Sequence, residues 1–232
     1  MRFSVQREAL LRPLQQVVGV VERRQTLPVL ANVLIRVEGD GASFTATDLE
    51  VELSARMAVD NAEEGEITVP ARKLFDIVRA LPDGSKIDLK QEGERVRLSS
   101  GRSRYTLATL SAREFPATEA GDVQERIEID QGSFKKLLER SAFAMAVQDV
   151  RYYLNGLLVE VRSNGLRTVA TDGHRLALAE TAGIADGEVR RQVIVPRKGV
   201  LELQRLLEGG DAPLELAFSK NHVQIGRASC RE

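Results

Sequence analysis

Acidic and imidazole side chains that could bind a metal ion occur close together in the second half of the chain. Asp172 and His174 are two residues apart, and Asp149 lies upstream of them. An open catalytic zinc site needs about three protein ligands. The chain has two histidines, and the other one, His222, is expected on a different strand. A metal-dependent hydrolase that uses Asp149, Asp172 and His174 is therefore kept only as an alternative function.

The rest of the sequence offers no other recognisable catalytic motif. It contains neither the Gly-x-Ser-x-Gly elbow of a hydrolase nor the P-loop of a nucleotide-binding enzyme. Cys230 is the single cysteine, so an intrachain disulfide and a cysteine-rich zinc site are both excluded. The chain shows no signal peptide and no apolar run near the roughly 20 residues of a membrane helix. These absences suggest a cytosolic protein, and no metal or cofactor is expected.

An Ala-Thr-Asp step occurs twice, at 46–48 and at 170–172. In the second copy, Asp172 and Gly173 stand between two apolar runs, a pattern typical of a hairpin with a two-residue turn in which both central residues have φ > 0. Only this copy continues with Gly173, His174 and Arg175. Any function assigned to the chain must account for the repeat and for this difference.

The first 123 residues predict two units, each with the order strand, helix, three strands. Apolar residues at spacings of three and four indicate a helix over 7–24, although Pro13 suggests a start nearer Leu11. The expected elements around it are strands 3–5, 29–38, 42–47 and 49–59, with a turn at Asp40-Gly41. The second unit has strand 67–70, helix 72–81, and strands 86–91, 95–99 and 104–110.

The same order returns after a polar stretch at 113–121, which is the best linker candidate. Strand 127–129 leads to Asp130 as a helix N-cap, then to helix 134–143 and strands 152–161, 166–171 and 175–181. Strand 192–196, helix 197–207, and strands 213–217 and 222–225 complete the series. Asn32 and Asn155 correspond, as do the Val-Pro steps at 69–70 and 195–196, so a whole domain is duplicated.

We therefore predict an α+β fold of two tandem domains, each a duplicated βαβββ unit with two helices packed on antiparallel sheets. The boundaries are expected at 1–123 and 124–226. The second domain lacks a counterpart of strand 104–110, and residues 227–232 are interpreted as a truncated or foreign tail.

The predicted helices carry a net positive charge, whereas the rest of the chain is net negative. Over 7–24, 72–80, 133–146 and 197–208 they contain 13 Lys or Arg and 6 Asp or Glu, a net charge of +7 in a chain whose net charge is −1. Amphipathic helices always expose charged residues, but here the excess is positive in all four. If the helices share one side of the sheets, that side is basic and would attract a polyanion through counterion release.

Several long motifs resemble the bacterial DNA polymerase III beta subunit, the sliding clamp family. They are Gln-Asp-Val-Arg-Tyr-Tyr-Leu-Asn-Gly at 148–156, Ala-Thr-Asp-Gly-His-Arg-Leu-Ala at 170–177 and Val-Ile-Val-Pro-Arg-Lys-Gly-Val at 193–200, with shorter matches at 10–17 and 101–104. The resemblance runs from Met1 to about Gly226. That family has three such domains in each chain, so the third domain and the last strand of the second are missing from this sequence.

The resemblance implies a head-to-tail homodimeric ring of six domains, with helices facing double-stranded DNA and sheets on the outside. Such a clamp tethers the replicative polymerase and has no catalytic activity of its own. Its partners are the DNA polymerase III alpha subunit, the clamp loader and repair polymerases, which dock through short linear motifs. It implies a location in the bacterial cytoplasm, associated with the nucleoid. A protein-binding scaffold that never touches DNA is the other alternative.

The resemblance also assigns residues to three surfaces. The DNA-binding residues are Arg24, Gln148, Tyr152 and Tyr153, and the basic helix starts add Arg72, Lys73, Arg197 and Lys198. The partner-peptide cleft takes Leu154, Thr171, Gly173, His174, Arg175 and Leu176, and the dimer edge takes Arg104, Tyr105 and Leu107. Because Tyr152 and Tyr153 are expected at a strand start, their rings should point to opposite faces, one of them into the core. Without a third domain, we expect weak peptide binding and a monomer.

Overall fold

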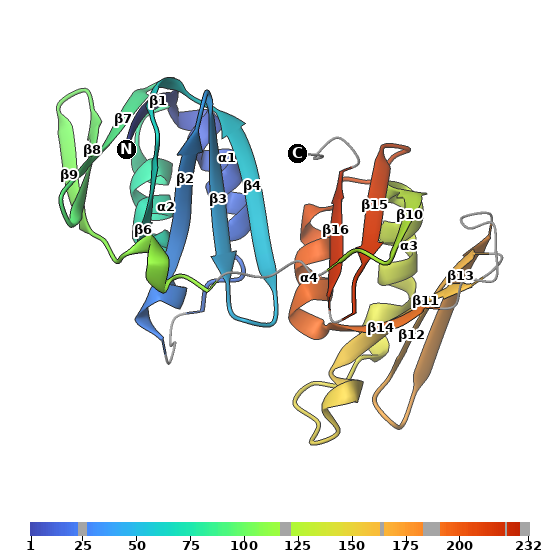
Figure 1. Cartoon of the computed structure of the whole chain (residues 1–232). Helices are drawn as coiled ribbons and strands as arrows, with labels where there is room; N and C mark the ends of the chain where they lie inside the picture. Colours follow the sequence, from blue (N-terminus) through green and yellow to red (C-terminus); the bar gives the residue numbers. More distant parts are fainter. Residues whose placement is uncertain (23–26, 117–121, 163–164, 183–190, 221, 228–232) are drawn as a thin grey trace. The chain divides into compact units, whose positions relative to one another are not determined.

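The computed structural model describes residues 1–22, 27–116, 122–162, 165–182, 191–220 and 222–227 (Figure 1). The chain divides into two compact units, Met1–Thr118 and Glu119–Glu232, and each unit is described by itself. None of the helices in the described ranges is both long enough and apolar enough to span a lipid bilayer.

The first unit combines two antiparallel sheets with two helices. One sheet has the strand order β5-β1-β7-β8-β9 and the other β4-β3-β2-β6. The strands are β1 (Arg2–Gln6), β2 (Asn32–Glu38), β3 (Gly41–Thr47), β4 (Glu52–Ala58), β5 (Asp60–Glu63), β6 (Gly65–Pro70), β7 (Lys86–Glu92), β8 (Arg95–Ser100) and β9 (Ser103–Ala108). The helices are α1 (Arg7–Val17) and α2 (Ala71–Ala80), with short 3-10 turns η1 (Pro28–Ala31) and η2 (Ala112–Glu114).

One hydrophobic core holds this unit together. Buried side chains alternate along the strands, and α1 and α2 present Leu10, Leu14 and Leu74 to the same cluster. Helix α1 packs against β4 and α2. Because each helix has one apolar stripe, the opposite stripe stays in water and carries the charged residues.

The second unit repeats this arrangement. Its sheets have the orders β13-β12-β11-β14 and β10-β15-β16, which match β4-β3-β2-β6 and β1-β7-β8 of the first unit. The strands are β10 (Glu125–Asp130), β11 (Gly156–Arg162), β12 (Gly165–Thr171), β13 (Leu176–Ala182), β14 (Arg191–Pro196), β15 (Pro213–Phe218) and β16 (Val223–Arg227). The helices are α3 (Gln131–Ser141) and α4 (Arg197–Leu206), and the 3-10 turns are η3 (Ala142–Ala144) and η4 (Tyr152–Leu154). The predicted α+β fold with helices on antiparallel sheets is confirmed.

In each unit a cation on the first helix binds the end of the second helix. Arg7 of α1 donates from Nε to the carbonyl of Val78 (3.1 Å) and from Nη2 to that of Arg79 (2.9 Å), at the C-terminus of α2. Lys135 of α3 donates from Nζ to the carbonyl of Leu207 (2.9 Å), just after α4. The last carbonyls of a helix have no partner within it, so each cation satisfies these acceptors and fixes the helix pair.

Several predicted element bounds were wrong. Helix α1 begins at Arg7 and ends at Val17, not at 24, and Pro13 lies inside it on the buried face. Residues 28–31 form a 3-10 turn before β2, and the additional strand β5 pairs with β1. The predicted N-cap is confirmed: the Asp130 side chain accepts from the Ser133 amide at 2.6 Å.

The tail expected at 227–232 lies outside the described residues except for Arg227. Strand β16 extends to Arg227, one residue beyond the predicted boundary, and residues 228–232 lie outside the described residues. The linker predicted at 113–121 falls on η2 and on residues 117–121, which also lie outside the described residues.

Candidate functional site

The turn between β12 and β13 is built by two of its own side chains. Thr171 pairs with Leu176, so four residues rather than the predicted two form the loop. The Asp172 carboxylate accepts from the amides of His174 and Arg175, both at 3.0 Å. The Thr171 hydroxyl accepts from the Gly173 amide (3.1 Å) and donates to the Arg175 carbonyl (2.7 Å). Within the loop only Gly173 has a positive φ, of 89°.

The Asp172 carboxylate is already hydrogen-bonded within this turn. The amides of Arg175 and His174, followed by the Arg175 guanidinium, lower the pKa of Asp172 to about 2. Asp149 is held in a similar way, since hydrogen bonds from the side chain and amide of Arg151 lower its pKa to about 2. Across the described residues, no three His, Cys, Asp or Glu side chains come together as metal ligands. The geometry therefore gives the hydrolase alternative no support.

The segment after α3, residues 142–154, folds back beside this turn. Its conformation is fixed by Asn155, whose Oδ1 accepts from the Asp149 amide and whose Nδ2 donates to the Asp149 carbonyl, both at 2.8 Å. Arg151 donates to both carboxylate oxygens of Asp149, from Nε at 3.0 Å and from Nη2 at 2.9 Å. These bonds hold the tip of the segment outward, so that the side chain of Val150 is 96% exposed.

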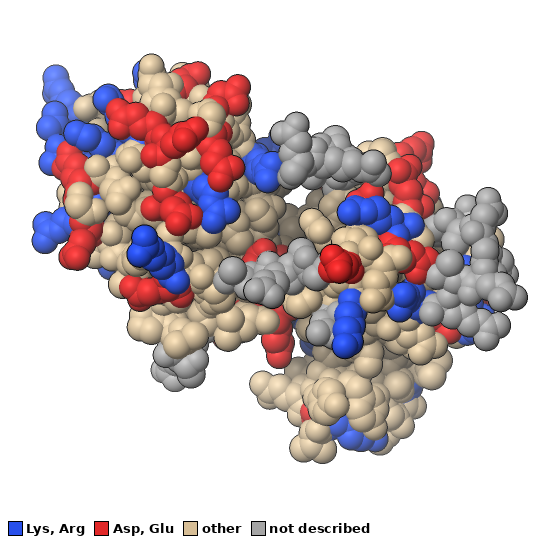
Figure 2. All heavy atoms as spheres, viewed as in Figure 1, with Lys and Arg blue, Asp and Glu red and all other residues tan. Residues whose placement is uncertain are grey.

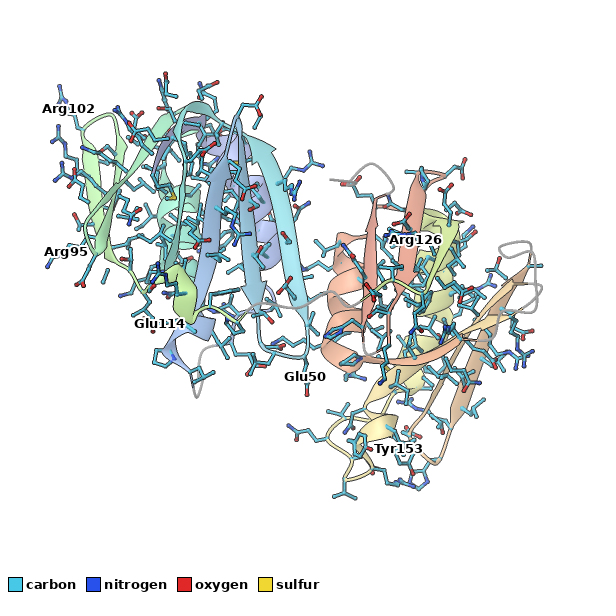
Figure 3. The ribbon with its side chains drawn as sticks, viewed as in Figure 1. Glu50, Arg95, Arg102, Glu114, Arg126 and Tyr153 are labelled. Carbon is cyan, nitrogen blue, oxygen red and sulfur yellow. The ribbon has the colours of Figure 1, made fainter. Side chains whose placement is uncertain are left out.

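The two tyrosines do not take the predicted positions. They lie in η4 rather than at the start of a strand, and neither is buried: Tyr152 is 84% and Tyr153 51% exposed. Their ring centroids are 6.0 Å apart in an edge-to-face arrangement. The prediction that one ring enters the core was wrong because a 3-10 turn does not alternate its side chains as a strand does. Tyr153 marks this exposed end of the second unit in Figure 3.

The residues expected at the peptide cleft are brought together in the second unit. Five of them belong to the β12–β13 turn, and the sixth, Leu154, lies in η4. The amide of Leu154 donates to the carbonyl of Arg151 (2.8 Å), whose guanidinium lies against Gly173. Leu154 is buried, whereas Leu176 is 64% exposed.

A row of apolar side chains lies on the same face of the sheet as Leu176. On the outer face of this sheet Leu178 pairs with Val169, Val169 with Leu158, and Leu158 with Ile194. Leu178 and Ile194 at the two ends of the row are exposed. The alternation of Leu176 and Leu178 was visible in the sequence, but the strand order that adds Leu158 and Ile194 was not.

The residues expected to bind DNA lie at different places in the two units. Arg24 lies outside the described residues. Arg72 and Arg197 stand at the starts of α2 and α4 and each donates to a backbone carbonyl, of Val21 and of Met145 respectively. Lys73 is exposed on α2, and Gln148 is exposed with a φ of 58°. Lys198 is half-buried at the start of α4.

The expected dimer residues lie on β9, the last strand of its sheet in the described part of the chain. Arg104 is exposed, Tyr105 half-buried and Leu107 buried. Figure 2 shows Lys and Arg along the β8–β9 edge, where Arg95 and Arg102 point outward in Figure 3. The sheet side of the first unit seen in Figure 2 carries both signs of charge.

Comparison with known proteins identifies the family. Residues 1–119 match the model of the DNA polymerase III beta subunit, N-terminal domain, and residues 128–231 that of its central domain. The beta sliding clamps of Pseudomonas putida and Escherichia coli strain K12 are 53% and 50% identical over 225 residues, 97% of this chain. The chain spans 61% of the length of these curated relatives.

Solved structures agree with these matches. The crystal structure of the DNA polymerase III subunit beta from Pseudomonas aeruginosa superposes with a TM-score of 0.94 at 52% identity, over 97% of this chain and 62% of that one. The sliding clamp of Caulobacter crescentus gives a TM-score of 0.91 at 41% identity, over 98% of this chain and 63% of that one. By sequence and by fold, the chain belongs to the DNA polymerase III beta subunit family, of which it contains the N-terminal and central domains.

Proposed function

We propose that the chain is part of a sliding clamp, a non-catalytic protein that encircles duplex DNA and tethers the replicative polymerase during synthesis. The observation that carries this proposal is the match to both domain models in the same order, together with relatives named beta sliding clamp at 50–54% identity over nearly the whole chain. The proposed location is the bacterial cytoplasm, in association with the nucleoid.

Duplex DNA is the proposed ligand of the helices. Exposed cations on α2 and half-buried cations at the start of α4 support it, because cations can displace counterions from phosphates without reading sequence. In the segment between α3 and β11, the exposed Gln148, Tyr152 and Tyr153 offer further hydrogen-bonding and stacking groups. The proposed DNA-binding set remains Arg24, Arg72, Lys73, Gln148, Tyr152, Tyr153, Arg197 and Lys198.

The first test is the salt dependence of duplex binding. A fluorescent duplex is titrated with the 232-residue chain at salt concentrations between about 50 and 200 mM, a range in which phosphate contacts lose most of their affinity. A clamp should bind more weakly as salt rises and with little preference for sequence. A scaffold that never touches DNA would show no salt-dependent binding of the duplex. A metal-dependent hydrolase would instead bind a metal ion and cleave its substrate.

A short peptide motif is the proposed ligand of the β12–β13 turn. An extended chain could place apolar side chains against Leu176 and the row beside it, and the exposed guanidinium of Arg175 could provide a polar contact. Solved clamps of Pseudomonas aeruginosa and Bartonella birtlesii are described as bound to griselimycin. We propose griselimycin as a probe of this surface, and the alpha subunit, clamp loader and repair polymerases as its natural partners.

Binding at this surface is expected to be weak in the 232-residue chain. The relatives extend well beyond the two domains matched here, and the family resemblance places the other half of the cleft in a third domain. Calorimetric titration with griselimycin should therefore give a lower affinity than for a three-domain clamp of Pseudomonas aeruginosa. Equal affinities would show that the two domains suffice.

A further inference from the structure

The turn that carries the proposed peptide site occurs twice in the chain. In the first unit Thr47 Oγ1 accepts from the Leu49 amide and donates to the Val51 carbonyl, both at 3.0 Å. Asp48 Oδ1 accepts from the amides of Glu50 (3.0 Å) and Val51 (2.8 Å). These are the bonds of the 171–175 turn, position for position. The third residue has a positive φ in both, 81° at Leu49 and 89° at Gly173.

This comparison shows that the backbone of the turn does not require glycine. Leucine adopts the same φ in the first unit, where its side chain is 60% exposed. In the second unit, a Cβ added to Gly173 would lie 3.2 Å from Nη2 and 3.5 Å from Nη1 of Arg151. What distinguishes the second turn is therefore the guanidinium that lies against it.

Arg151 is held by Asp149, although its side chain is 50% exposed. Its guanidinium is fixed by two hydrogen bonds to Asp149, and Asp149 is fixed in turn by Asn155. A second contact joins the same two segments, because the Arg175 guanidinium lies over the Phe143 ring at 5.7 Å from its centroid. The turn and residues 142–154 are thus in contact through two arginines, one from each side.

The exposed face of residues 142–154 carries groups proposed to bind DNA. Gln148 and Tyr152 lie three residues before and one residue after Arg151, and both are exposed. We propose that Arg151 is a positioning residue that couples the 171–175 turn to these side chains, so that a peptide on the turn changes how the chain holds duplex DNA. This inference rests on the proposed function, which supplies the two ligands. By linkage, DNA must change the affinity for the peptide by the same factor.

A double-mutant cycle read by fluorine NMR tests the coupling without any ligand. The chain has three tyrosines, Tyr105, Tyr152 and Tyr153, so 3-fluorotyrosine labelling gives three signals that Tyr→Phe variants assign. Gly173→Ala should shift the Tyr152 or Tyr153 signal and leave Tyr105 unchanged. In an Arg151→Ala background the same substitution should produce no such shift, because the side chain that transmits it is gone. A shift of the same size in both backgrounds would overturn the proposal.

Two further variants keep the result interpretable. Leu49→Ala changes the equivalent turn of the first unit and should leave Tyr152 and Tyr153 unmoved. If Gly173→Ala fails to fold, Arg151→Lys keeps the charge but loses the planar fork. That variant should shift the Tyr152 or Tyr153 signal, and unchanged signals would count against a positioning role.

The affinity for duplex DNA is measured for the same set of variants. Gly173→Ala should weaken binding of the fluorescent duplex several-fold in the parent chain and have no effect in the Arg151→Ala background. If no protein in the cycle binds DNA while the fluorine signals behave as expected, the proposed function fails and the coupling stands. If all bind DNA and Gly173→Ala acts equally in both backgrounds, the coupling fails and the proposed function stands.

Discussion

At the scale of single residues, the backbone of the repeated turn is strained at Leu49 in the first unit and unstrained at Gly173 in the second. Leu49 has a φ of 81°, a region in which a side chain costs about 1–2 kcal/mol. Glycine at that position would cost about 0.5–1 kcal/mol in extra unfolded-state freedom. Because Leu49 is largely exposed, little burial is lost. We expect Leu49→Gly to raise the free energy of unfolding by roughly 0.5–1 kcal/mol.

Native-state hydrogen exchange at the amides of β3 and β4 measures this change in the first unit alone. The turn of the second unit serves as an internal control, since its exchange rates should not change. Faster exchange at β3 and β4 would mean that the Leu49 side chain contributes more than its backbone strain costs.

Asp149 and Asp172 make a pH-dependent prediction. Both have pKa values near 2 instead of the ordinary 3.8, because amides and an arginine hold their charged forms. A lowered pKa means that each carboxylate stabilises the folded state above pH 3.8 and loses this contribution as the pH falls toward 2. Titration of the carboxyl carbons by NMR should give midpoints near 2 for these two residues. Midpoints near 3.8 would show that neither contact forms in solution.

At the scale of elements, each helix pair depends on a cation that binds the end of its second helix. Arg7 makes two such bonds to α2, and its side chain is 13% exposed. A charged hydrogen bond contributes about 1.5–3 kcal/mol. Arg7→Ala should therefore lower the free energy of unfolding of the first unit by about 2 kcal/mol. Urea unfolding measures it, with the exposed Arg102→Ala as the matched loss of an arginine. Equal effects of the two substitutions would argue against a capping role.

Elements that depend on local sequence pattern could be predicted, whereas elements that depend on tertiary contacts could not. The helices and most strands followed from apolar periodicity, and the duplication followed from the matching Asn and Val-Pro steps. The η4 turn did not, because Tyr152 and Tyr153 favour a strand while the bonds between Asn155 and Asp149 impose a turn. The length of the β12–β13 loop was missed for a similar reason: Asp172 and Thr171 bind its amides.

The candidate site likewise has one part that the sequence predicts and one part that it does not. The cleft residues at 171–176 are consecutive, so their proximity could be predicted from the motif itself. The contact of Arg151 with Gly173 joins residues 22 positions apart and depends on how the segment after α3 folds back. Sequence pattern carries no signal for such a contact. The roles of all these residues remain predictions.

At the scale of the whole molecule, the proposed dimer edge predicts how the chain behaves in solution. The family resemblance pairs β9 with a third domain of a second copy, and only two domains are matched here. The 232-residue chain should therefore sediment mainly as a monomer. Arg104→Glu, at the exposed side of this edge, should leave the sedimentation coefficient unchanged. A stable dimer that Arg104→Glu dissociates would show that β9 associates without that domain.

The location of positive charge matters more than its amount if the helices face DNA. Lys73 is exposed on α2, whereas Arg95 is exposed on the sheet strand β8, so charge reversal at either position changes the net charge equally. Lys73→Glu should weaken duplex binding and reduce the slope of log K against log salt by about 0.9 for the lost phosphate contact. Arg24→Glu should act in the same direction. Arg95→Glu should leave the slope unchanged.

Titration of the fluorescent duplex at several salt concentrations separates these outcomes. If Lys73→Glu and Arg95→Glu weaken binding equally, the protein attracts DNA only through its overall field, and the helices have no special part. If only Arg95→Glu acts, DNA lies against the sheets. Either result would remove the geometric basis of a clamp, because a ring that slides on DNA must contact it from one side of each domain.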